Sequence, residues 1–165
     1  MDLTGVHGFL SALDGRLRDI GLDTTYVEGE RGVQIGDTLR TLMAVTDEAH
    51  PVITEFVVTG FAEDADLLHI YTTVLLHVER SKEALASHLL ECNLLCPLGH
   101  FGIYEEEGQL YHKYSYPFDR DTAPEDLALT AENLLGLIYE VISGNYPSLE
   151  PFADAPEADE KGGTQ

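Results

Sequence analysis

Three segments in the first half of the chain are rich in β-branched and apolar residues, and no helical pattern separates them. They are LRTLMAVT at 39–46, VITEFVVT at 52–59 and DLLHIYTTVLLHV at 66–78, with shorter glycine-bounded pieces around Tyr26–Glu28 and Val33–Ile35. Such runs are typical of strands. Strands that follow one another through short loops pair antiparallel, whereas parallel strands need a crossover connection. The succession therefore predicts an antiparallel sheet.

Helical patterns lie on either side of these strands. At the N-terminus, residues 3–20 carry an apolar side chain every three or four residues, and Gly21 follows as a natural stop. The members of this stripe are Leu3, Val6, Leu10, Leu13, Leu17 and Ile20. A second helix is expected from a cap at Ser81 to Pro97 and Gly99, with Leu85, Leu89, Cys92 and Cys96 on one face.

The last third of the chain predicts a hairpin and a third helix. Segments 99–105 and 109–117 flank Glu-Glu-Gly, a turn signal. Thr122 and Glu125 have capping-box spacing before an apolar stripe that we expect to end at Gly144. The predicted fold class is therefore α+β, with three helices packed on an antiparallel sheet in the order α-β-β-β-α-β-β-α. The predicted domain spans 1–152, and the polar, acidic tail 153–165 is expected to be disordered.

The charge of the chain narrows the classes of partner. Thirty acidic residues against nine basic ones give a formal net charge of −21. Nucleic acids and anionic membranes are disfavoured, because their phosphates attract lysine and arginine. A basic protein or peptide would be attracted, although charge can also serve solubility alone. Two cysteines are too few for a disulfide framework, and the sequence shows neither a signal peptide nor a run of 18 apolar residues, so we expect a cytoplasmic protein.

Four residues near the second helix are the best candidates for chemistry. Cys92, Cys96, His100 and His112 are residue types that bind zinc. The two cysteines share the apolar face of a helix, however, and buried cysteines commonly pack as small hydrophobic residues. They also lie at the C-terminal end of the helix, where the helix dipole disfavours a thiolate. We therefore expect no metal, cofactor or catalytic residue, and the metal- or small-ligand-binding sensor or enzyme stays the alternative hypothesis.

Two sequence features predict a surface for a partner protein. In 66–78, one face of the strand is apolar, and the other mixes apolar and polar side chains, as expected for a surface that touches a partner or a helix. The second hairpin strand is rich in tyrosine, which is favoured at interfaces, although packing against the third helix is the other interpretation. The partner-binding candidates are Tyr71, Leu75, His77, Tyr111 and Tyr114.

The segment from the second helix to the end of the domain carries a distinctive pattern of core and turn residues. The pattern is a helix ending in LLECN, then LCPLGHFGIYEEEGQLYHKYSYP, then a helix ending near SGNYPSL. The matching positions are Leu90, Asn93, Leu98, Gly99, Phe101, Gly108, Tyr114, Pro117, Leu134 and Tyr146. With these residues the chain resembles the YbjN-like domain family. The similarity covers roughly residues 3–152, and its motifs are mostly core and turn residues.

This resemblance implies a fold similar to class I type III secretion chaperones, with three helices against a strongly twisted antiparallel sheet. Those chaperones are small, acidic, homodimeric proteins that hold a partner segment along hydrophobic grooves, and YbjN-like proteins are described as regulators of sensory transduction. No catalytic residues come with the family. The leading hypothesis is a non-enzymatic, homodimeric, chaperone- or regulator-like module that holds a segment of another protein or peptide.

Overall fold

A computed structural model describes residues 1–29, 36–45, 51–78, 82–104, 106 and 108–154. These described residues form three α-helices, six strands and one short 3-10 helix. In chain order they are α1 (Leu3–Asp19), β1 (Thr24–Val27), β2 (Thr38–Ala44), β3 (Pro51–Gly60), β4 (Ala65–Leu75), α2 (Lys82–Leu95), β5 (His100–Tyr104), β6 (Gln109–Asp119), α3 (Pro124–Leu149) and the short 3-10 helix η2 (Glu150–Phe152).

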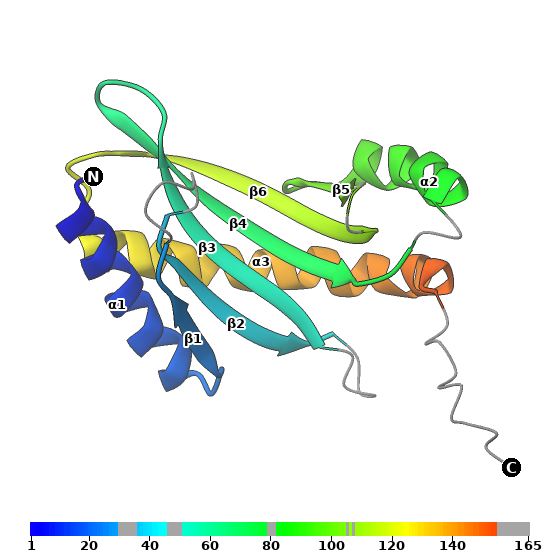
Figure 1. Ribbon diagram of the computed structural model, residues 1–165, viewed down its shortest axis with the longest axis horizontal. Coiled ribbons are helices and arrows are strands. Elements are labelled where there is room, and N and C mark those ends of the chain that lie inside the picture. Colours follow the sequence, from blue (N-terminus) through cyan, green and yellow to red (C-terminus); the bar gives the residue numbers. More distant parts are fainter. Residues whose placement is uncertain (30–35, 46–50, 79–81, 105, 107, 155–165) are drawn as a thin grey trace, which may run out of the picture.

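The six strands form one antiparallel sheet in the order β1-β2-β3-β4-β6-β5 (Figure 1). The α+β class is confirmed, but the expected count of three strands before the second helix is wrong, because there are four. The piece around Tyr26 is a strand in its own right, since Tyr26 pairs with Leu39 of β2. The other short piece, Val33–Ile35, lies outside the described residues.

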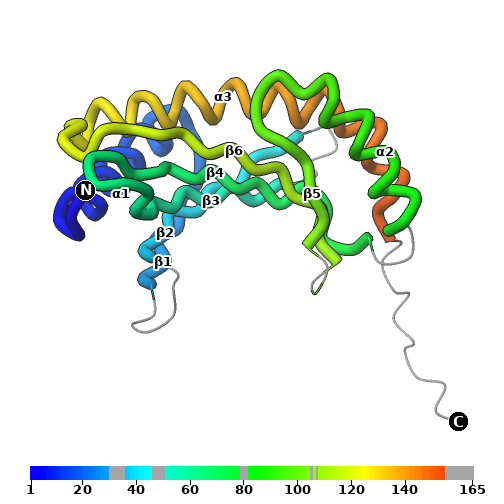
Figure 2. The backbone as a smooth tube through the Cα atoms, turned by 90° about the horizontal axis from the view of Figure 1, so that it is seen from above, coloured from blue at the N-terminus to red at the C-terminus, as the bar shows by residue number. Residues whose placement is uncertain are grey.

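The helices leave one face of the sheet uncovered. Figure 2 shows α1 and α3 on one side of the strands and α2 beyond the β5 edge. Alternate residues of each strand face the helices, so that β4 alternates between buried and half-buried residues over most of its length. Phe56 and Ile70 from the sheet meet Leu13 of α1 and Ile138 of α3 in one apolar core. None of the described helices covers the other face of the sheet (Figure 2).

Helix α1 ends through a glycine, as its sequence predicts. Gly21 has a φ of 87°, its N–H donates to Arg18 O, and the N–H of Leu22 donates to Leu17 O. This pair of bonds satisfies carbonyl groups that the helix end would otherwise leave unpaired. Both ends of the predicted stripe, Leu3 and Ile20, are exposed, so only its centre packs in the core.

Helix α3 differs from the sequence prediction at both ends. Its N-cap is Ala123, which makes no side-chain hydrogen bond, so the predicted Thr122 capping box is wrong. The helix also continues past Gly144 and through Pro147 to Leu149. Tyr146 and Leu149 are buried in the core, and their burial outweighs the local preference of glycine and proline for ending a helix.

Helix α2 lies along the β5 edge of the sheet (Figure 1). Asn93 holds it there, because its side chain accepts a hydrogen bond from the Phe101 N–H (2.7 Å) and donates one to the Phe101 carbonyl (2.9 Å). Asn93 thus supplies the hydrogen bonds that a further strand would otherwise make to the Phe101 backbone. The predicted cap Ser81 lies outside the described residues.

The β5–β6 hairpin forms as the sequence predicts. Gly108 has a φ of 58° in its turn, and Gly99 has a φ of 76° where the chain enters β5. Residues 155–165 of the predicted disordered tail lie outside the described residues. Its first two residues are hydrogen-bonded, since Ala153 donates to Glu150 O and Asp154 to His77 O.

One described helix is long and apolar enough to cross a membrane by length and composition, the segment Pro124–Phe152. Core helices of soluble proteins pass the same test, and one face of this helix is buried against the sheet and α1. The cytoplasmic location therefore stays a prediction.

Candidate functional site

The four Cys and His candidates do not meet at one point. His100 pairs in register with Lys113, whereas Phe101 pairs with His112, so the two histidines point to opposite faces of the hairpin. Cys96 Sγ donates to the Leu98 carbonyl at 3.2 Å instead of facing a histidine. Within the described part of the chain, no three His, Cys, Asp or Glu side chains come together in a way that could hold a metal ion.

The surroundings of His112 are those of a residue that stabilises the fold. It is fully buried against the Phe101 ring, with the ring centroids 5.0 Å apart. Its Nε2 lies 2.8 Å from the Leu98 carbonyl oxygen, which can only accept, so Nε2 carries the proton. Its Nδ1 is buried and has no hydrogen-bond partner among the residues that the structure describes. Burial lowers the pKa of His112, against the hydrogen bond to Leu98, and keeps the ring neutral.

Cys92 is a poor nucleophile in this position. Its Sγ lies 3.5 Å from His88 Nε2, and that same nitrogen is 3.1 Å from Ser148 Oγ. Burial raises the pKa of the Cys92 thiol, so the unreactive thiol form is favoured. Through its contact with Ser148, His88 links α2 to the end of α3. Its ring also stacks on the Phe152 ring of η2, with the centroids 5.4 Å apart.

Two of the five partner-binding candidates lie on the open face of the sheet. Tyr71 faces Lys113 in register and Tyr111 faces Thr73, and all four are half-buried. The Lys113 Nζ lies 4.8 Å from the centre of the Tyr71 ring, within cation–π range.

Tyr111 is the centre of this open-face group. Its ring makes edge contacts with Tyr71, Tyr104 and His100, at centroid distances of 6.3, 5.8 and 6.4 Å. A Cβ atom at Gly102 would lie 2.5 Å from the Tyr111 hydroxyl, so the tyrosine lies directly over the glycine. Tyr104 and His100 are not among the five partner-binding candidates, although both alternate with Gly102 on β5.

A histidine on the same face joins three strands. His69 of β4 lies 2.8 Å from Thr59 Oγ1 of β3 through Nε2, and 2.8 Å from Ser115 Oγ of β6 through Nδ1. Burial and then the charge of Lys113 lower the pKa of His69. Both ring nitrogens are engaged by hydroxyl groups, so this residue stabilises the pairing of the central strands.

The other three partner-binding candidates do not lie on the open face of the sheet. Leu75 is only 7% exposed and pairs with buried Leu110, because a bulge after Thr73 shifts the register and turns Leu75 into the core. Tyr114 pairs with buried Ile70 and packs against the core, so it lies on the helix-covered face. His77 is exposed, but it follows the end of β4.

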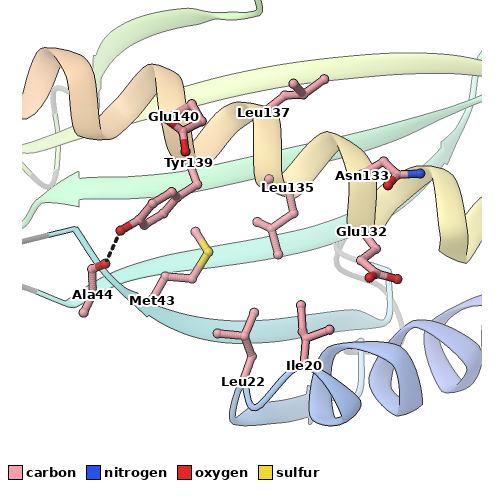
Figure 3. Close-up of a pocket in the computed structure, with 11 residues that line it drawn as sticks. Ile20, Leu22, Met43, Ala44, Glu132, Asn133, Leu135, Leu137, Tyr139 and Glu140 are labelled. Carbon is pink, nitrogen blue, oxygen red and sulfur yellow. Dashed lines mark hydrogen bonds between the residues drawn. The ribbon is translucent and has the colours of Figure 1, made fainter.

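An apolar groove lies on the side of the sheet that carries α1 and α3 (Figure 3). A groove of about 710 Å³ runs between the end of α1, the end of β2 and the middle of α3 (Figure 3). Ile20 and Leu22 point toward α3, Met43 reaches from β2, and Leu135 enters between them. Tyr139 closes one end by donating its hydroxyl to the Ala44 carbonyl at 3.0 Å.

The wall that α3 contributes to this groove is open and acidic. At Gly136 an added Cβ atom would meet nothing within 4 Å, so the helix backbone is accessible there. Glu132 and Glu140 line the groove, and Glu132 pairs with Arg16 at 2.5 Å. The whole of α3 contains four acidic residues and no lysine, arginine or histidine.

A second cavity, of about 620 Å³, adjoins the start of α1 but is built around an ion cluster. Asp66 is buried there, and it contacts the α-amino group of Met1 and the Arg120 Nε, the latter at 3.1 Å. Burial alone would raise the pKa of Asp66, but these hydrogen bonds and charges outweigh it and lower the pKa. The carboxylate is therefore already neutralised and serves the fold.

No family model matches the chain, and no curated protein matches it. The resemblance to YbjN-like domains therefore stays a prediction.

Proposed function

We propose that this chain is a non-enzymatic protein-binding domain, a chaperone- or regulator-like module that holds a segment of a partner polypeptide. The observation that carries this proposal is the groove between α1, β2 and α3. Pockets that bind ligands are concave and mostly apolar, with a few polar groups at the edge. The tyrosine group on the open sheet face is the lesser candidate, because its rings pack on one another.

The charge around the groove favours a basic segment. Glu140 is exposed at the rim, and α3 offers no cationic side chain that could compensate it. A partner segment that alternates apolar side chains with lysine or arginine would place the former over Met43 and Leu135 and the latter beside Glu140. Its backbone or an apolar side chain can approach α3 closely at Gly136.

The test compares two glycine variants of α3. A displayed peptide library is selected against the full chain, and we expect the enriched peptides to be apolar and basic. Gly136→Leu would fill the groove, and we expect it to weaken binding of a selected peptide about tenfold or more, a loss of roughly 1.4 kcal/mol. Gly144→Leu is the matched control, because its Cβ atom also meets nothing within 4 Å and it lies outside the groove.

Both substitutions should leave the fold intact, since leucine is favoured over glycine inside a helix by up to about 1 kcal/mol. Circular dichroism checks this directly. Equal peptide affinity in the two variants would show that the groove is not the binding site.

A further inference from the structure

His69 lies between two hydroxyl groups on the open face of the sheet. Its Nδ1 is 2.8 Å from Ser115 Oγ, and its Nε2 is 2.8 Å from Thr59 Oγ1. A neutral imidazole carries a single N–H, so one of its nitrogens donates a hydrogen bond and the other accepts one. One hydroxyl therefore donates its proton to the bare nitrogen, while the other accepts from the N–H and orients the ring.

We infer that Ser115 is a nucleophile that accepts an acyl group from an activated ester, with His69 as its general base. A hydroxyl group is activated when it lies within hydrogen-bond reach of a base that a third group orients. Ser115 has this role because its primary hydroxyl is less hindered than the hydroxyl of Thr59, whose β-carbon is branched. Thr59 is then a positioning residue, since it acts through His69 alone.

The surroundings of His69 suit a base. Burial, and then the charge of Lys113, lower the pKa of His69, so the ring is neutral and can take up a proton at neutral pH. Lys113 lies two residues before Ser115 on β6 and therefore on the same face of the sheet. Its ammonium group can attract the negative charge that develops on the carbonyl oxygen of the ester. Ser115 and His69 are half-buried, so a small acyl donor can reach them.

Acyl transfer to Ser115 needs no reactant other than the ester. Ser115 Oγ forms a bond to the carbonyl carbon while its proton passes to Nδ1 of His69. The tetrahedral intermediate then collapses, and the bond between the carbonyl carbon and the alcohol oxygen breaks. His69 returns the proton to the leaving alcohol. The products are an acylated serine and a free alcohol.

A second serine–histidine pair supplies a matched control. Ser148 Oγ is 3.1 Å from His88 Nε2, but it donates its proton to the Asn145 carbonyl at 2.9 Å. A hydroxyl group has one proton, so Ser148 cannot also donate to His88, and the histidine cannot act as its base. Ser148 is more exposed than Ser115, so exposure alone would favour acylation of Ser148. The inference predicts the opposite order.

Incubation of the full chain with p-nitrophenyl acetate at neutral pH tests the assignment, with the acetylated residue located by peptide mass spectrometry. We expect Ser115 to be acetylated fastest, with release of an equal amount of p-nitrophenol. His69→Gln can still bond to both hydroxyls but cannot take up a proton, so it should slow this acetylation about a hundredfold or more. Ser148→Ala should react like the natural chain.

Two variants of Thr59 test its positioning role. Thr59→Val keeps the shape of the side chain but removes the hydroxyl, so acetylation of Ser115 should slow, and Thr59→Ser should restore it. Circular dichroism checks that each variant folds. Acetylation of Ser148 or of amino groups with Ser115 unmodified, or equal rates in the natural chain and His69→Gln, would overturn the inference. This covalent step lies outside the proposed binding function, and none of its residues lines the groove.

Discussion

Gly99 stands at the junction of α2 and β5, where two physical requirements coincide. Its φ of 76° lies in the left-handed region, and an added Cβ atom would lie 2.5 Å from the Lys113 carbonyl oxygen and 2.6 Å from His112 Cε1. Gly21 has a similar φ of 87°, but an added Cβ atom there meets nothing within 4 Å. Comparing the same substitution at the two positions therefore separates the effect of backbone strain from that of steric overlap.

We expect Gly99→Ala to destabilise the fold by roughly 2 to 5 kcal/mol, from left-handed strain together with overpacking. Gly21→Ala should cost only about 1 to 2 kcal/mol from strain alone. Urea denaturation of both variants measures the difference. Equal losses would mean that the hairpin moves away from Gly99 at little cost.

His112 makes the stability of the fold depend on pH. Its pKa is lowered in the folded state from an ordinary value of 6.5, so the unfolded chain binds the proton more readily. Stability is therefore full above about pH 6.5 and falls on acidification, by at most about 1.4 kcal/mol per pH unit. The lowered pKa of His69 acts in the same direction.

Unfolding free energies at about pH 7.5 and about pH 5.5 test this dependence. His112→Gln can still donate to Leu98 but cannot take up a proton, so its stability should fall less on acidification. His77→Gln, at an exposed position, should behave like the natural chain. An unchanged pH dependence in His112→Gln would assign the effect to other groups.

At the scale of elements, the α2–β5 contact depends on one side chain. Asn93→Ala removes both hydrogen bonds to the Phe101 backbone and leaves that edge unpaired. We expect a loss of roughly 1 to 3 kcal/mol and faster hydrogen exchange at the Phe101 amide. Asn145→Ala removes a single bond within α3, to Val141 O, and should leave that exchange unchanged. Unaltered exchange in Asn93→Ala would show that packing alone holds α2.

The same scale shows what the sequence can and cannot predict. Positive-φ glycines such as Gly21 and Gly108 mark ends and turns through local chemistry, so those boundaries could be predicted. The end of α3 could not, because the burial of Tyr146 and Leu149 is a tertiary effect. Leu75 turns into the core because a bulge after Thr73 interrupts the strict alternation on which its predicted exposure depends.

The groove could not be predicted from the sequence at all. Ile20, Met43 and Leu135 come from three distant parts of the chain, and no spacing in the sequence connects them. Only the packing of α1 and β2 with α3 brings them together. The open-face pair Tyr71 and Tyr111 could be predicted because both lie on strands whose alternation is regular at those positions.

At the scale of the whole molecule, the net charge of −21 should control association. Binding of a selected basic peptide should weaken roughly tenfold between about 0.05 and 0.5 M salt, because salt screens the attraction to the acidic rim. Isothermal titration at several salt concentrations measures it. An affinity that does not change with salt would contradict the proposed attraction between charges, but not the proposed apolar contacts.

The central claim is that the groove between α1, β2 and α3 holds the partner segment. Amide chemical shifts of the isotope-labelled chain, followed while a selected peptide is added, test it most directly. We expect the largest changes at Leu22, Met43 and Gly136, with little change at Tyr71 and Tyr111. Changes concentrated on the two tyrosines, with the groove residues unaffected, would contradict it.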